Sequence, residues 1–169
     1  KPYSPSVIPY LRNMEKMGLL TSYRVWKSRK SIYRLASHVM KLYYYLESRY
    51  NLEDREVSIE EMKPTVDRLN DFAVEELLSD FMADTVGGRV ELLKDREKEL
   101  DIFITKRNKP YLVGEVKWGR SSKNDLEKFR NKVLDFDCEK VFITKKRLED
   151  DEIRIITPDD IVSIAFEGD

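Results

Sequence analysis

Residues 99–118 read ELDIFITKRNKPYLVGEVKW, and this stretch decides the fold of the second half of the chain. Two alternating segments, 99–105 and 111–117, flank the turn 106–110 and predict an antiparallel hairpin. If Thr105 pairs with Tyr111, one face is wholly apolar apart from a glycine. A slip of one residue would move this apolar set to the other face, so the pattern predicts the register. That face carries Leu100, Ile102, Ile104, Leu112, Gly114 and Val116.

The other face of the hairpin places Asp101 directly opposite Glu115, with Lys117 on the same face. Opposed side chains lie about 4.5–5.5 Å apart at Cβ, and like charges there are destabilising. A shared proton, a neighbouring cation such as Lys117 or a divalent metal would relieve the repulsion. Mg²⁺ is often bound by one or two carboxylates together with waters and substrate phosphates. Two carboxylates and a lysine on one face are therefore the minimum set of side chains for metal-assisted phosphodiester hydrolysis. The carboxylates would hold the metal, and the lysine would position or deprotonate the attacking water.

These motifs resemble a known superfamily. The sequence E-x-D, a hairpin and then G-E-V-K-W is similar to motifs of the PD-(D/E)xK nucleases. Nearly the whole chain also resembles the carboxy-terminal region of archaeal DEXX-box P-loop ATPases, in which a winged helix precedes a nuclease-like domain of unknown function. The segments that carry this resemblance are IYRLASHVMKLYYYLESRY (32–50), FAVEELLSDFM (72–82), KELDIFITKRNKPYLVGEVKW (98–118) and EKVFITKK (139–146).

The resemblance implies roles for particular residues. Asp101 and Glu115 would be catalytic metal ligands for Mg²⁺ or Mn²⁺, and Lys117 would be the catalytic lysine. A further acidic ligand would come from the preceding helix, where Asp71 and Glu75 are four residues apart and so lie on one side. The family's usual Phe-Glu at that helix start is Asn70-Asp71 here. ATP would act only through an upstream ATPase domain absent from this chain, which has no P-loop motif.

Alternating strand and helix patterns predict an α/β fold, and the resemblance implies a restriction-endonuclease-like mixed sheet flanked by helices and preceded by a partial winged helix. We expect a winged-helix part at 1–35, a helical connector at 36–64 and the nuclease-like domain at 65–169. Pro64 is predicted to interrupt or restart the helix around it. Apolar spacing predicts that the following helix, about 65–83, buries the stripe Val74, Leu77, Leu78, Phe81 and Met82.

Charge is unevenly distributed along the chain, although the net charge is only −1. Residues 1–50 contain ten Lys and Arg against two Glu, whereas the remainder contains 21 basic and 30 acidic residues. Such asymmetry predicts an anionic partner for the basic end. The predicted first helix and the hairpin turn after it would contact nucleic acid, with DNA as the expected form. The candidate residues are Arg12, Lys16, Lys27, Arg29 and Lys30.

Composition excludes several classes of protein. Among the 169 residues, 41% are hydrophobic and 37% are charged, which is unlike a disordered chain. The apolar runs are too short to cross a membrane, and the single cysteine, Cys138, excludes a disulfide framework or a multi-cysteine zinc site. The lack of a signal-peptide pattern predicts a cytoplasmic protein. Abundant Lys and Glu with no Gln predict a hyperthermophilic source.

Two functions remain open from the sequence. One is a divalent-metal-dependent nuclease-like hydrolase, the carboxy-terminal part of a larger archaeal ATPase. The other is a catalytically inactive DNA- or protein-binding regulatory module of that ATPase, built on the same sheet. A homo-oligomer is compatible with either.

Overall fold

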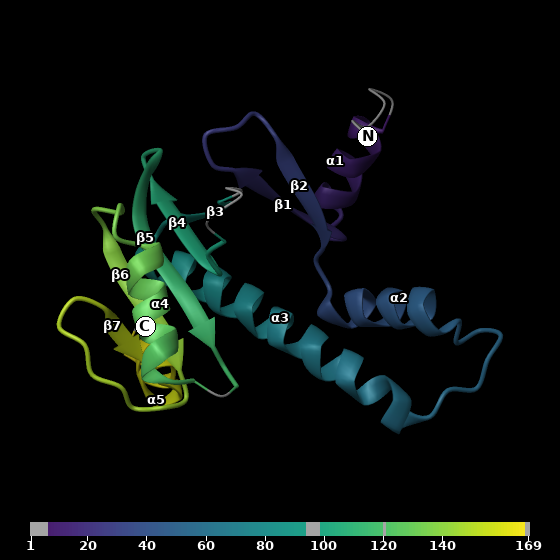
Figure 1. Cartoon of the computed structure of the whole chain (residues 1–169). Coiled ribbons are helices and arrows are strands. Elements are labelled where there is room, and N and C mark those ends of the chain that lie inside the picture. The colour runs from purple at the N-terminus through teal and green to yellow at the C-terminus, as the bar shows by residue number, and fades with distance from the viewer. Residues whose placement is uncertain (1–6, 94–98, 120, 168–169) are drawn as a thin grey trace. The chain divides into compact units, whose positions relative to one another are not determined.

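The computed structural model describes residues 7–93, 99–119 and 121–167. The chain is an α/β protein that divides into two compact units, Lys1–Asn70 and Asp71–Asp169 (Figure 1). Within the described ranges, no helix is long and apolar enough to cross a membrane.

The first unit begins with a helix and a hairpin, as predicted. Helix α1 (Ile8–Lys16) precedes strands β1 (Leu20–Val25) and β2 (Ser31–Leu35), which pair antiparallel. Helix α2 (His38–Tyr50) follows, and the Ser37 side chain accepts a hydrogen bond from the Met40 N–H at its start. The helix–hairpin–helix order therefore confirms the secondary structure expected for residues 7–50.

Helix α3 (Ile59–Val86) is continuous, so the predicted interruption at Pro64 is wrong. Proline removes one backbone hydrogen bond, to the carbonyl four residues earlier, and its ring crowds that carbonyl. Pro64 lies on an exposed part of the helix, where water can satisfy the released carbonyl. The helix ends before Gly87, whose positive φ of 63° suits glycine. The boundary between the two units falls inside this helix.

The second unit is built on a mixed sheet with the order β3-β4-β5-β6-β7. Its first three strands pair antiparallel and its last three pair parallel. Two further helices, α4 and α5, complete the unit, and these elements confirm the predicted α/β class with a mixed sheet flanked by helices. The bounds are β3 Arg89–Leu92, β4 Ile102–Lys106, β5 Lys109–Lys117, α4 Lys123–Lys132, β6 Glu139–Thr144, β7 Arg154–Ile156 and α5 Pro158–Glu167.

Both faces of this sheet are covered. On one face Leu78 and Met82 of α3 pack against Ile102, Ile104 and other apolar side chains of β4, β5 and β6. On the other face aromatic contacts join the sheet to α4 and the loop after it, through the pairs Phe129–Phe142 and Phe103–Phe136. In Figure 1, α4 and α3 lie on opposite sides of the sheet. The predicted burial of Leu77 is wrong, because its side chain is 60% exposed beside its buried neighbours.

The β4–β5 hairpin has the predicted register in its centre and a different turn at its tip. Ile102 pairs with Gly114, and Ile104 pairs with Leu112, as expected. Thr105 pairs with Pro110 rather than with Tyr111, and a bulge separates the two registers. The cause is a two-residue turn in which Arg107 and Asn108 both have positive φ, 51° and 58°. Such turns match the strand twist, and the bulge accommodates the extra residue.

Gly114 fits a position where no side chain has room. A Cβ atom added there would lie 2.6 Å from Val141 Cγ2 and 3.2 Å from Ile102 Cβ. The strands on either side of β5 therefore pack closely around this glycine. Glu115 and Lys117, two of the predicted site residues, follow on the same strand.

Candidate active site

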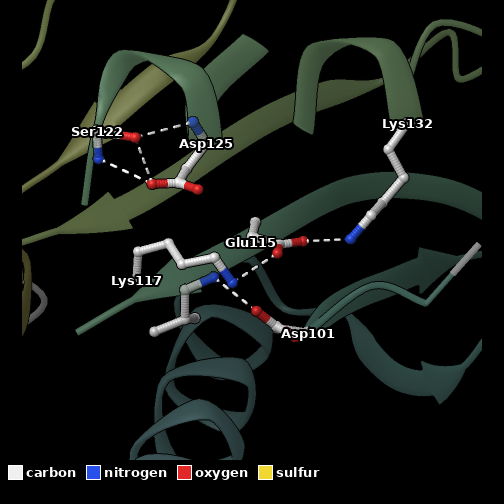
Figure 2. A network of polar contacts seen from close by, with 7 residues as sticks. Asp101, Glu115, Lys117, Ser122, Asp125 and Lys132 are labelled. Carbon is white, nitrogen blue, oxygen red and sulfur yellow. Dashed lines mark hydrogen bonds and ion pairs between the residues drawn. The ribbon is translucent and has the colours of Figure 1, made fainter. Parts of the chain in front are cut away.

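A cluster of charged side chains lies where the central strands of the second unit meet α4. Asp101 immediately precedes β4, and Glu115 and Lys117 lie at the carboxyl end of β5. Lys132 is in the last turn of α4 (Figure 2). β5 and β6 are parallel, so their carboxyl ends lie at the same edge of the sheet. Ligands of α/β proteins commonly bind at this edge.

Glu115 is at the centre of the cluster and is bound by two lysines. Its Oε1 lies 2.7 Å from Lys117 Nζ, and its Oε2 accepts a hydrogen bond of 2.6 Å from Lys132 Nζ. The glutamate side chain is only 12% exposed, while the two lysine side chains are 34% and 28% exposed. Both oxygens of a nearly buried carboxylate are therefore neutralised by cations of this chain.

Asp101 contributes to the sheet as well as to the cluster. Its Oδ2 accepts a 2.9 Å hydrogen bond from the Val116 N–H, next to the pair Ile102–Gly114. Burial raises the pKa of Asp101, and the negative charge of Glu115 raises it further. The hairpin register predicts that these two carboxylates face each other, and the effect of Glu115 on the pKa of Asp101 is consistent with repulsion between them.

Glu75 of α3 is the third carboxylate of the cluster. Partial burial raises its pKa from the ordinary 4.5 to about 7, and the charge of Asp101 contributes next. Lys117 lowers this pKa, while Asp71 and Glu115 raise it further. Of the two acidic residues predicted from α3, Glu75 is half-buried and Asp71 is exposed. Of the two predicted residues, Glu75 is therefore the one whose charge interacts with the cluster.

Lys117 is held in its charged form. Burial alone would lower its pKa, but the hydrogen bond to Glu115 and the charges of Glu115, Asp101 and Glu75 raise it instead. An ammonium group at this position can donate hydrogen bonds to a phosphate oxygen or orient a water molecule. It is not suited to accept a proton while these carboxylates surround it.

Sequence reasoning missed Lys132. Its contact depends on α4 packing across β5, which brings together residues 17 positions apart. The available signal was weak, because cations are favoured in the last turn of many helices, where they interact with the helix dipole.

The first turn of α4 begins near the same cluster. Ser122 caps the helix, and its backbone N–H and hydroxyl donate to Asp125 Oδ2 at 2.9 and 2.6 Å (Figure 2). The hydrogen bond from the Ser122 side chain is the main cause that lowers the pKa of Asp125, with smaller contributions that include the charge of Lys117. This reciprocal cap fixes the start of the helix that carries Lys132 at its other end.

The donor set suits a hard divalent cation with a small number of protein ligands. Asp101 and Glu115 supply carboxylate oxygens, and Mg²⁺ commonly retains several waters beside one or two carboxylates. In the part of the chain that the structure describes, no three His, Cys, Asp or Glu residues form a group that could hold a metal ion. The two carboxylates therefore suit Mg²⁺ or Mn²⁺ best if Glu115 exchanges a lysine contact for the ion.

The predicted nucleic-acid-binding residues lie in the first unit, and all are exposed. Arg12 and Lys16 are on α1, whereas Lys27, Arg29 and Lys30 are in the β1–β2 turn. Lys27 Nζ lies 6.0 Å from the centre of the Trp26 ring, which is at the outer limit of a cation–π contact. These five cations are available to phosphates on the surface of their own unit.

Comparison of the chain with protein-family models, with curated proteins and with solved structures gives no match. The resemblance to the carboxy-terminal region of archaeal ATPases therefore remains a prediction from sequence motifs.

Proposed function

We propose that the second unit is a divalent-metal-dependent, nuclease-like phosphodiester hydrolase acting on nucleic acid, with DNA as the expected substrate. The observation that carries this proposal is the cluster itself: Asp101, Glu115 and Lys117 lie together, and Glu75 adds a third interacting carboxylate. Carboxylates that can hold a metal, with a neighbouring lysine at the carboxyl edge of a mixed sheet, suit metal-assisted hydrolysis.

Asp101 and Glu115 would hold Mg²⁺ or Mn²⁺ in this proposal. A bound divalent ion supplies Lewis-acid polarisation of the phosphate and lowers the pKa of an attacking water. The protonated Lys117 orients that water or donates to a non-bridging phosphate oxygen as negative charge develops. The low solvent exposure of Glu115 strengthens these electrostatic interactions.

The exposed cations of the first unit would contribute affinity for the phosphate backbone. Contacts of this kind are strongly dependent on salt and carry little sequence information. In the larger context, the chain would be the carboxy-terminal part of a cytoplasmic archaeal ATPase, and that ATPase would supply ATP hydrolysis from another domain.

A second function is favoured by one observation. Lys117 and Lys132 already neutralise both oxygens of Glu115, so the cluster is satisfied without a metal. A site satisfied in this way also suits a catalytically inactive module that binds DNA or a protein partner and regulates the ATPase.

Cleavage of supercoiled plasmid in the presence of Mn²⁺ separates these two functions. We expect nicking by the wild-type chain and a loss of at least about 100-fold in Lys117→Ala, the range that general acid–base and electrostatic groups supply. Lys109→Ala, at the other exposed end of β5, is the matched control and should cleave like the wild type. Equal cleavage by wild type and Lys117→Ala would refute the catalytic role, and no cleavage by the wild type would favour the inactive module.

A further inference from the structure

Lys132 occupies an oxygen that the proposed metal site needs. Its Nζ is 2.6 Å from Glu115 Oε2, while Lys117 holds Oε1 at 2.7 Å. Each carboxylate oxygen keeps a second lone pair, but an ammonium group at each oxygen repels an incoming cation, so a metal binds Glu115 more favourably once one lysine withdraws. Glu115 is 12% exposed, so water can replace a departing lysine only in part.

The two lysines are unequal in their freedom to leave. Lys117 is two residues from Glu115 on the same strand, so strand geometry keeps the two side chains on one face. Lys132 reaches Glu115 from the last turn of α4, 17 residues away. A lysine side chain has four flexible carbon–carbon bonds, and at this position it retains a favourable interaction with the helix dipole after it releases the carboxylate.

The charges of the cluster indicate where Lys132 would go. Apart from Glu75 of α3, the group around Glu115 has two negative charges, on Asp101 and Glu115, and two positive charges, on Lys117 and Lys132. A divalent ion entering this balanced group adds two positive charges in a partly buried site, which is unfavourable without a compensating anion. A phosphate supplies that anion, and it is also a good acceptor for a released ammonium group.

We propose that Lys132 is a resident counter-ion of Glu115 that competes with the divalent metal and transfers to a phosphate when the metal binds. This inference rests on the proposed function, because it assigns Lys132 a positioning role in the same site. It also predicts that metal and phosphate bind cooperatively, each making room for the other.

Calorimetric titration with Mn²⁺ alone tests the competition. Lys132→Met should bind Mn²⁺ about tenfold more tightly than the wild type, which corresponds to about 1.4 kcal/mol. This value lies between the small contribution of exposed ion pairs and the large one of buried pairs. Lys128→Met, one turn earlier on α4 at an exposed position, is the matched control and should bind like the wild type. Thermal melting establishes that each variant is folded.

Lys132→Arg provides a second variant that keeps the positive charge. An arginine can hold a carboxylate with two hydrogen bonds, so this variant should bind Mn²⁺ no more tightly than the wild type. Inorganic phosphate should tighten Mn²⁺ binding to the wild type and have a smaller effect on Lys132→Met, since that variant has no competing lysine to transfer.

The outcomes distinguish the two proposals. If Mn²⁺ binds the wild type and Glu115→Gln abolishes that binding, but Lys132→Met binds no more tightly than the wild type, the counter-ion role is refuted alone. If Lys132→Met is unfolded and Lys132→Arg binds Mn²⁺ more tightly than the wild type, the role is also refuted. If neither the wild type nor Lys132→Met binds Mn²⁺ at all, the proposed metal-dependent function is refuted. The counter-ion role is then refuted as well, because it rests on that function.

Discussion

Glu75 makes the stability of the second unit depend on pH in an unusual direction. Its pKa is raised from 4.5 to about 7, mainly by burial and then by the charge of Asp101. Between these two values the folded protein keeps the proton on Glu75 and the unfolded chain has lost it. The unfolded state therefore binds fewer protons, and the free energy of unfolding falls as the pH rises from about 4.5 to about 7.

The size of this effect follows from the pKa difference. A shift of about 2.5 pH units corresponds to at most about 3.4 kcal/mol at about 1.36 kcal/mol per unit. Glu75 is only half-buried, so solvent screening reduces the effect to about 1–2 kcal/mol. Glu75→Gln removes the charge and keeps the shape, and it should therefore stabilise the metal-free protein by about that amount at pH 8 and by almost nothing at pH 4.

Urea denaturation of both proteins at several values from pH 4 to pH 8 measures this difference. Burial and the charge of Glu115 raise the pKa of Asp101 in both proteins, so these two contributions cancel in the comparison. Glu127→Gln, an exposed position on α4, serves as the control and should show no such trend. Parallel stability curves for wild type and Glu75→Gln, or a gap that closes at high pH, would refute the placement of Glu75 in this electrostatic cluster.

Two further substitutions test the packing around the site by urea denaturation. Gly114→Ala should destabilise the protein by about 1–3 kcal/mol, because its methyl group would lie 2.6 Å from Val141 Cγ2; Gly119→Ala, with open space around it, should be nearly neutral. Asp150→Ala should cost about 1–3 kcal/mol, because its 3% exposed side chain accepts two backbone N–H groups at 2.9 Å. Asp151→Ala, at an exposed neighbour, should change stability by less than about 0.5 kcal/mol.

The hairpin register could be predicted from sequence because burial selects it. A slip of one residue would separate Ile102 and Ile104 from Leu112 on opposite faces, and the structure has the alignment that keeps them together in the centre of the hairpin. The turn could not be predicted in the same way. Arg107 adopts a positive φ that non-glycine residues seldom take, so its conformation follows from the strand twist and not from a local preference.

Some residues of the candidate site could be predicted from the sequence, and others could not. Asp101, Glu115 and Lys117 are close in sequence or joined by the hairpin, so strand periodicity was enough to bring them together. Lys132 and the choice between Asp71 and Glu75 depend on how helices pack against the sheet. Helix periodicity gives the face of a helix but not its position along the sheet, so these features required the three-dimensional structure.

The hydrogen bond from the Val116 N–H to Asp101 has a consequence for how substitutions at this position are interpreted. The carboxylate completes the hydrogen bonding of β5 beyond the end of β4, so selection for folding alone would retain an acceptor here even in a chain without turnover. The presence of this aspartate in any similar sequence is therefore weak evidence of activity. Asp101→Asn, which keeps an acceptor oxygen while removing the charge, separates the two roles where Asp101→Ala would confound them.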